Sequence, residues 1–177
     1  MCNVEHFSVF IHQYAKGRAP GYCSRFGHLD GSAIVLSLIL VVLLVLRDRL
    51  AALQLPAASA GAGILTLVTK NIIERIRPSE AQQLIVVSGF SYPSGHSVST
   101  SALYLTIAIL ASRYVQHSGA RAAIFLAVSA VLSMVGASRV YLGVHYATDV
   151  VSGISLGAAW ALLLAGFFTL GSHRSSS

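Results

Sequence analysis

Apolar residues gather in long unbroken runs along the chain, and polar residues are largely confined to the stretches between them. A helix needs about 20 apolar residues to cross a hydrocarbon core of about 30 Å. Four runs are long or apolar enough to do so: Ser32–Leu46, Ala51–Val68, Ala122–Ala137 and Val150–Leu170. A fifth, Ser97–Ala111, is shorter and rich in serine, and we include it because the polar clusters described below need a crossing there. The pattern predicts an all-α, polytopic transmembrane bundle of about five helices.

The two ends of the chain differ from this apolar body. Residues 1–30 mix basic and aromatic residues without an apolar run, so we expect either a short interfacial helix over Val4–Tyr14 or a disordered tail. Cys2 and Cys23 could pair in an oxidising compartment, but two cysteines without a spacing signature are more often two thiols. We expect residues 31–170 to form one transmembrane domain and residues 171–177 to form a polar tail.

Composition supports a membrane protein, because 55% of the residues are hydrophobic and 10% are charged, outside the usual range of a soluble domain. The positive-inside rule places short basic turns in the cytoplasm. On one orientation those turns carry Arg47, Arg49, Arg113, Arg121 and Arg174. The other side has more basic residues in total, but several of them are candidate site residues. We therefore expect an inner-membrane protein whose polar clusters face outward, with no nucleic-acid partner.

The first of three polar clusters is KNIIERIRP, residues 70–78. Lys70 and Arg77 are seven residues apart, so they would lie on nearly the same face of a helix, two turns from each other. Pro78 disfavours helical geometry at the residue before it, so we expect the helix to end at Arg77.

The other two clusters are PSGH, residues 93–96, and SRVYLGVHYATD, residues 138–149. In the third cluster His145 and Asp149 stand at positions i and i+4, at the start of the last apolar run. The second and third clusters are separated by 41 residues, enough for two crossings and a turn. All three clusters are therefore expected on one side of the membrane.

Together these clusters carry the groups that bind a doubly charged tetrahedral anion. Arginine binds phosphate through its planar fork, and the free N–H groups at the start of a helix also favour anions. The candidate phosphate ligands are the side chains of Lys70, Arg77 and Arg139 and the backbone amides of Ser94 and Gly95.

The two histidines suggest covalent catalysis. Asp149 would fix the tautomer of His145, whose other ring nitrogen could then attack phosphorus. His96 would protonate the leaving oxygen and later activate the water that hydrolyses the phosphohistidine. The chain has only six scattered acidic residues and no carboxylate cluster for a metal, so we expect a phosphatase without a metal or other cofactor. Taken singly, each motif is more often a turn, a basic collar or a hydrogen-bonded polar residue.

In order, the clusters resemble the three-part signature of the type 2 phosphatidic acid phosphatase (PAP2) family, membrane relatives of the vanadium haloperoxidases. The matching motifs are Lys70-x6-Arg77-Pro78, Pro93-Ser94-Gly95-His96 and Ser138-Arg139-x5-His145-x3-Asp149. The resemblance implies that His145 is the nucleophile, Asp149 its partner and His96 the acid. It also implies a phosphate pocket lined by Lys70, Arg77, Ser94, Gly95, Ser138 and Arg139.

The same resemblance implies an integral membrane enzyme that dephosphorylates phosphatidic acid, phosphatidylglycerophosphate or undecaprenyl pyrophosphate at the outer face. Members usually have six spans, whereas this chain shows five, with residues 1–30 in the place of the first. The same residues could serve a phosphotransferase with a lipid acceptor. A transporter is less favoured because the ionisable groups gather at the ends of the runs, and a haloperoxidase is less favoured still. Neither the substrate lipid nor the oligomeric state can be read from the sequence.

Overall fold

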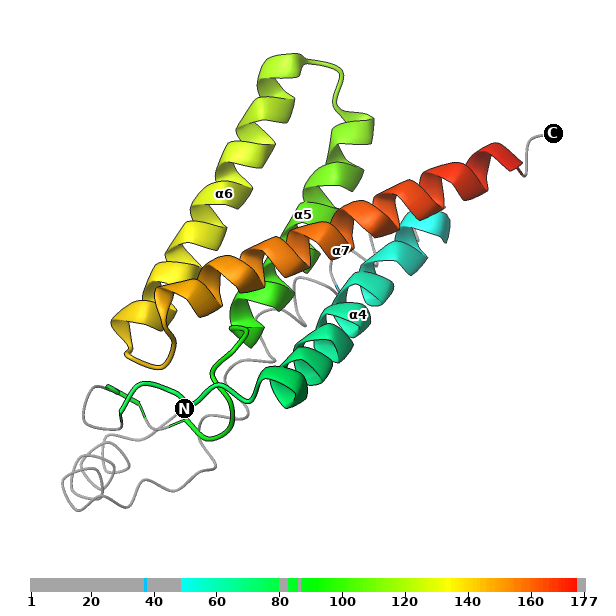
Figure 1. Ribbon diagram of the computed structural model, residues 1–177. Coiled ribbons are helices and arrows are strands. Elements are labelled where there is room, and N and C mark those ends of the chain that lie inside the picture. Colours follow the sequence, from blue (N-terminus) through cyan, green and yellow to red (C-terminus); the bar gives the residue numbers. More distant parts are fainter. Residues whose placement is uncertain (1–36, 38–48, 80–82, 86, 175–177) are drawn as a thin grey trace, which may run out of the picture. The chain divides into compact units, whose positions relative to one another are not determined.

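The computed structural model describes residues 37, 49–79, 83–85 and 87–174. This part of the chain forms four helices and no strand (Figure 1). The helices are α4 (Arg49–Ile73), α5 (Gly95–Tyr114), α6 (Ser118–Tyr141) and α7 (Ala147–Arg174). They coincide with four of the five predicted runs, which confirms the all-helical prediction. The fifth run, Ser32–Leu46, lies outside the described residues apart from residue 37, as do residues 1–30.

Three of the four helices are long and apolar enough to cross a bilayer. The qualifying segments are Ala51–Ile73 in α4, Ser118–Tyr141 in α6 and Ala147–Thr169 in α7. Large apolar side chains on α6 and α7 stand clear of the other helices; Leu126 and Leu163, for example, are 70% and 67% exposed. Apolar surface of this kind is stable in hydrocarbon and unfavourable in water, so these three helices are the membrane-spanning candidates among the described residues.

Helix α5 is less apolar but lies at the centre of the bundle, in contact with α4, α6 and α7. Its buried hydroxyl side chains have hydrogen-bond partners inside the protein, as a low-dielectric surrounding requires. Ser101 Oγ donates to the Ile154 carbonyl of α7 at 2.8 Å, and Thr106 Oγ1 donates to the Ala102 carbonyl of its own helix at 2.7 Å. The other helices shield α5 from lipid, which explains why a serine-rich segment is stable there.

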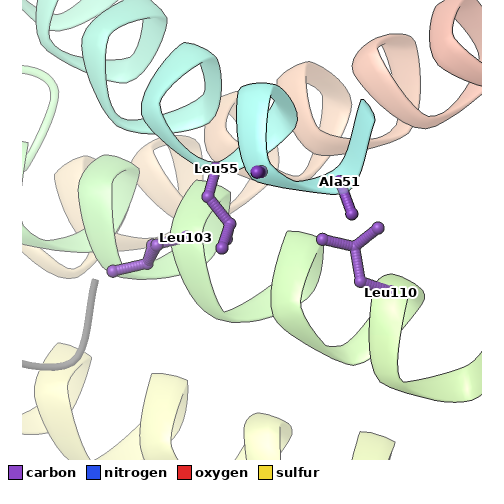
Figure 2. Packing of buried hydrophobic residues seen from close by; sticks show 5 residues of the cluster. Ala51, Leu55, Leu103 and Leu110 are labelled. Carbon is purple, nitrogen blue, oxygen red and sulfur yellow. The ribbon is translucent and has the colours of Figure 1, made fainter. Parts of the chain in front are cut away.

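Helices α4 and α5 run antiparallel, as their packing contacts show. Near the start of α4, Ala51 and Leu55 pack with Leu103 and Leu110 from the later part of α5 (Figure 2). At the other end of the pair, Thr66 of α4 lies beside the first residue of α5. The end of α4 is thereby held next to the start of α5, where two of the polar clusters are found.

Two glycines allow α7 to approach the backbone of α5 very closely. A Cβ atom at Gly153 would lie 2.8 Å from the Ser94 carbonyl oxygen, and one at Gly157 would lie 2.4 Å from the Val98 carbonyl oxygen. No side chain fits at either position unless the helices separate. The relative position of α5 and α7 is therefore set by direct contact with main-chain atoms.

The predicted end of α4 is wrong. We expected the helix to continue to Arg77 before Pro78, whereas it ends at Ile73. The cause is Glu74, which adopts the left-handed conformation with φ 48° and donates its N–H to the Lys70 carbonyl at 3.0 Å. Lys70 and Arg77 are consequently not on one helical face, and the loop after α4 decides where Arg77 lies.

The close contact at Gly157 predicts that two glycine-to-alanine substitutions in α7 will have different effects on the thermal unfolding temperature. Gly157→Ala should lower the thermal unfolding temperature in detergent, because overpacking of this kind costs about 1–3 kcal/mol. Gly166→Ala is the matched control, since a Cβ atom there meets nothing within 4 Å. It should be neutral or stabilising because alanine favours helix by up to about 1 kcal/mol. Equal unfolding temperatures for the two variants, measured by circular dichroism, would contradict the described packing.

Candidate active site

The three polar clusters meet at one end of the described helices. The end of α4, the start of α5, the end of α6 and the start of α7 lie at the same end in Figure 1. Backbone hydrogen bonds join the connecting segments there: Leu84 N–H donates to the Leu142 carbonyl, and Ser94 N–H donates to the Asp149 carbonyl, both at 3.0 Å. Residues 70–79, 87–96 and 138–149 therefore form one polar region.

His145 and Asp149 are both buried in this region, with 5% and 0% of each residue exposed. His145 lies in the connection before α7, and Asp149 lies in the first turn of that helix. His145 Nδ1 is 3.6 Å from Asp149 Oδ2, slightly longer than a hydrogen bond, and Nδ1 has no other hydrogen-bond partner among the described residues. The carboxylate is thus the nearest acceptor for a proton on Nδ1.

Both oxygens of the Asp149 carboxylate also accept hydrogen bonds from other donors. Oδ1 accepts from Arg75 Nη1 at 2.8 Å, while Oδ2 accepts from the Ser91 hydroxyl and from the Tyr146 N–H at 3.0 Å. The bond from Tyr146 also caps the start of α7, because a carboxylate in the first turn commonly accepts the N–H of the residue before the helix. Asp149 therefore has a structural function beside any chemical one.

Arg77 joins the loop after α4 to His145. Its Nε donates to the Gly89 carbonyl at 2.9 Å and its Nη1 donates to the Val144 carbonyl at 2.7 Å. Nη1 also lies 3.3 Å from His145 Nε2. A guanidinium group can only donate, so this contact requires an unprotonated Nε2 and places the proton of a neutral ring on Nδ1, facing Asp149.

The other predicted phosphate ligands lie around this pair. Lys70 Nζ, in the last turn of α4, donates to the Phe90 carbonyl and so holds the segment that leads into α5. Arg139 Nε, in the last turn of α6, lies 3.3 Å from Ser138 Oγ, and that hydroxyl donates to the Val135 carbonyl at 2.7 Å. Both cations are half-buried at the same end as His145.

Ser94 differs from the sequence-based expectation. Ser94 is fully buried. Its N–H donates to the Asp149 carbonyl, and its hydroxyl oxygen accepts a hydrogen bond from Ser97 Oγ at 3.0 Å. The structure therefore does not offer the Ser94 amide to phosphate, because that amide connects α5 to α7. Gly95 and His96 begin α5 and are half-buried in its first turn, at the positive end of the helix dipole.

Positive charge outweighs negative charge around His145. Burial, reinforced by the charges of Arg77 and Lys70, lowers the pKa of His145 to about 4, although Asp149 opposes the shift. Burial also lowers the pKa of Arg77, again against the effect of Asp149. A neutral histidine beside several cations is suited to an anionic ligand. Within the described residues, no three His, Cys, Asp or Glu side chains lie close enough to hold a metal ion.

Two further residues belong to this region but were missed from the sequence. Arg75 contacts Asp149 and Thr148, and its guanidinium carbon lies 4.3 Å from the centre of the Tyr146 ring. Ser91 donates its hydroxyl to Asp149 and its N–H to the Arg75 carbonyl at 2.7 Å. The only sequence signals were the proximity of Arg75 to Arg77 and of Ser91 to the second cluster.

Comparison with known proteins places these features in a family. The PAP2 superfamily model matches residues 51–170, most of the chain. Phosphatidylglycerophosphatase B of Bacillus subtilis is 35% identical over 144 residues, which cover 79% of this chain and 70% of that protein. Lipid A 1-phosphatase of Rhizobium johnstonii is 34% identical over 113 residues, covering 59% of this chain and 42% of that protein.

Comparison with solved structures supports the same family. The crystal structure of a transmembrane PAP2 type phosphatidylglycerolphosphate phosphatase from Bacillus subtilis superposes with a TM-score of 0.63 and 27% identity, covering 93% of this chain and 94% of that one. Aquifex aeolicus LpxE superposes with a TM-score of 0.57 and 26% identity, covering 94% and 96%. The chain therefore belongs to the PAP2 superfamily and is a membrane lipid phosphatase.

Proposed function

We propose that this phosphatase works through a covalent phosphohistidine on His145. The observation that carries the proposal is the orientation of the ring. Nδ1 faces the Asp149 carboxylate at 3.6 Å, and the unprotonated Nε2 faces the Arg77 guanidinium at 3.3 Å. A phosphoryl group bound by Arg77 would therefore lie next to the lone pair that attacks it.

In the first step, Nε2 forms a bond to phosphorus while the bond to the lipid oxygen breaks. His96 gives that oxygen its proton, and the lipid alcohol, or the shortened lipid phosphate if the substrate is a pyrophosphate, departs. His96 then takes a proton from water, and the water oxygen bonds to phosphorus while the bond between phosphorus and Nε2 of His145 breaks. Inorganic phosphate leaves, and His145 returns to its neutral form. Asp149 stabilises the positive charge that develops on the ring during attack.

The phosphoryl oxygens would be held by side-chain cations and by donors at the start of α5. We assign this role to Lys70, Arg77, Arg139, Ser138 and the Gly95 amide, with Ser94 acting by holding α5 against Asp149. Arginine and lysine can stabilise the charge of the transition state without a metal ion. We therefore propose a metal-independent reaction, with residues 31–170 as the catalytic domain, residues 1–30 as a polar or interfacial segment and residues 171–177 as a polar tail.

The substrate is proposed to be a lipid phosphate with a simple headgroup. Relatives are named for activity on phosphatidylglycerophosphate, on lipid A and on decaprenylphosphoryl-5-phosphoribose. At the site end of this chain, residues 142–146 link α6 to α7 and residues 74–94 link α4 to α5, and neither linker is as long as a separate domain. These loops leave little material for reading a large headgroup, so phosphatidylglycerophosphate, phosphatidic acid and undecaprenyl pyrophosphate are the candidates.

The first prediction from the proposed function concerns the nucleophile. Purified protein in detergent should release phosphate from at least one of the three candidate lipids with EDTA present, and His145→Ala should lower that rate by at least about a thousandfold. Ser129→Ala is the control, because Ser129 lies on an exposed face of α6 and its hydroxyl donates to the Phe125 carbonyl of its own helix. Similar rates for the two variants would refute the role of His145, and loss of activity with EDTA would refute metal independence.

The intermediate can be detected in the same experiment. With substrate labelled in the transferred phosphate, alkaline quenching should trap label on the wild-type protein in an acid-labile form, and should trap none on His145→Ala. The fate of the label separates two activities. Label recovered as inorganic phosphate indicates hydrolysis, whereas label recovered on an added lipid alcohol would replace the proposal with a phosphotransferase.

The second prediction concerns pH. His145 must be neutral to attack, and its pKa of about 4 lies below the ordinary value of 6.5. The reactive form should therefore persist as pH falls through 6.5 and be lost only near pH 4. The acid limb of kcat/KM should have its midpoint near pH 4. An imidazole ¹⁵N resonance that is absent in His145→Asn should titrate at the same pH, and a midpoint between pH 6 and 7 for both would contradict the described burial.

The third prediction concerns orientation in the cell membrane. We propose that the site faces outward, because the opposite end carries the basic residues Arg113 and Arg121 beside the short α5–α6 turn. In a chain with Cys2 and Cys23 replaced by serine, Tyr141→Cys marks the site end and Gln116→Cys marks the other. A membrane-impermeant maleimide added to spheroplasts should label only Tyr141→Cys. Labelling of only Gln116→Cys would reverse the proposed orientation.

A further inference from the structure

Asp149 is held by a closed ring of hydrogen bonds that extends beyond the three motifs. Arg75 Nη1 donates to Asp149 Oδ1 at 2.8 Å, and the Ser91 hydroxyl donates to Asp149 Oδ2. Ser91 N–H donates in turn to the Arg75 carbonyl at 2.7 Å. The ring therefore joins the loop after α4, the segment before α5 and the first turn of α7, and the buried carboxylate is the point where all three meet.

The ring fixes the direction of the carboxylate. With Oδ1 bound to Arg75, the plane of the group is set, and Oδ2 is left on the side where His145 Nδ1 lies 3.6 Å away. Arg75 is itself fixed in three ways, by Asp149, by Thr148 Oγ1 at 2.8 Å and by the Tyr146 ring. A carboxylate that turned freely would not keep the imidazole in a single orientation.

We propose that Arg75 and Ser91 are positioning residues for the reaction, which act by holding the Asp149 carboxylate toward His145. The inference rests on the proposed nucleophilic role of His145. Neither residue is assigned to the phosphate: Arg75 directs Nη1 at the carboxylate, and Ser91 is fully buried. Arg75 is 38% exposed at its side chain, so its charge can be removed without emptying a buried space.

The two residues should affect the chemistry in separable ways. Removing the positive charge of Arg75 leaves the negative charge of Asp149 less compensated, which favours the protonated form of His145 and raises its pKa. Removing the Ser91 hydroxyl changes geometry but no charge. Among the described residues, the charged and histidine side chains on the elements at this end are Lys70 on α4, Glu74, Arg75 and Arg77 in the following loop, His96 on α5, Arg139 on α6 and Asp149 on α7.

The test uses the full chain in detergent and the best of the three candidate lipids. Arg75→Gln should lower kcat about tenfold to a hundredfold, with KM within about twofold, because misplacement by about 1 Å can cost a hundredfold in rate. Its acid limb of kcat/KM should move to higher pH. Arg75→Lys keeps the charge but lacks the planar fork, so its acid limb should stay near that of the wild type while kcat falls. Ser91→Ala should behave as Arg75→Lys does.

Arg113→Gln is the matched control, since Arg113 is exposed at the opposite end of α5 and should change neither kcat nor the acid limb. A raised KM with unchanged kcat in Arg75→Gln would overturn the proposal in favour of a substrate contact. Unchanged kcat in both Arg75→Lys and Ser91→Ala, with the proteins folded, would overturn it as well. If Arg75→Gln does not fold, the kcat values of those two variants decide between the positioning role and its absence.

The failure of this inference can be distinguished from that of the proposed function. If His145→Ala keeps its activity, His145 is not the nucleophile, and the positioning role proposed for Arg75 and Ser91 fails with it. If His145→Ala is inactive while the variants of Arg75 and Ser91 resemble Arg113→Gln, the nucleophile stands and only the positioning role is refuted.

Discussion

Burial of one carboxylate organises this end of the protein. Asp149 has no exposed surface, and a charge removed from water must be compensated by nearby donors and cations. Its compensation comes from Arg75, Ser91 and the Tyr146 N–H, which belong to three separate segments of the chain. The segments that carry the polar clusters are thus brought together by the requirement to satisfy a single anion.

The same carboxylate connects stability with chemistry. It caps α7 through Tyr146 and faces His145, while its backbone carbonyl accepts the Ser94 N–H and so fixes the start of α5. In the proposed mechanism Asp149 is a helix cap and also the partner of His145, so a substitution of Asp149 would disturb both functions. Variants of the residues around Asp149 are therefore more informative about the mechanism than variants of Asp149 itself.

The helices and most of the site residues could be predicted from the sequence. The hydrogen-bond partners within the site could not, because they depend on contacts that sequence spacing does not encode. Long apolar runs are a strong signal, so α4, α6 and α7 were expected. The spacing of His145 and Asp149 predicted both at the start of the last helix, whereas α7 begins at Ala147, so only Asp149 lies in its first turn and His145 lies in the connection before it. The early end of α4 could not be predicted, because a left-handed glutamate at position 74 has no sequence signature.

The contacts of Arg75 and Ser91 were likewise hidden, since they cross between loops far apart in the sequence. Ser94 shows a further limit. A serine-glycine turn before a helix suggests free amides, but tertiary packing assigned the Ser94 N–H to the Asp149 carbonyl. Local patterns therefore identified which residues gather at the site, while the partner of each donor was decided by the packing of the helices.

The close approach of α7 to α5 at Gly153 and Gly157 also affects how the protein responds to the lipid bilayer around it. Main-chain atoms in direct contact resist compression, so these two helices cannot approach each other more closely than the contact allows. Outward-facing side chains such as Leu126 and Leu163 can repack against acyl chains of different length or fluidity without moving the backbone beneath them. The minimum spacing of α5 and α7 is therefore set by contacts inside the protein and not by the side chains that face the lipid.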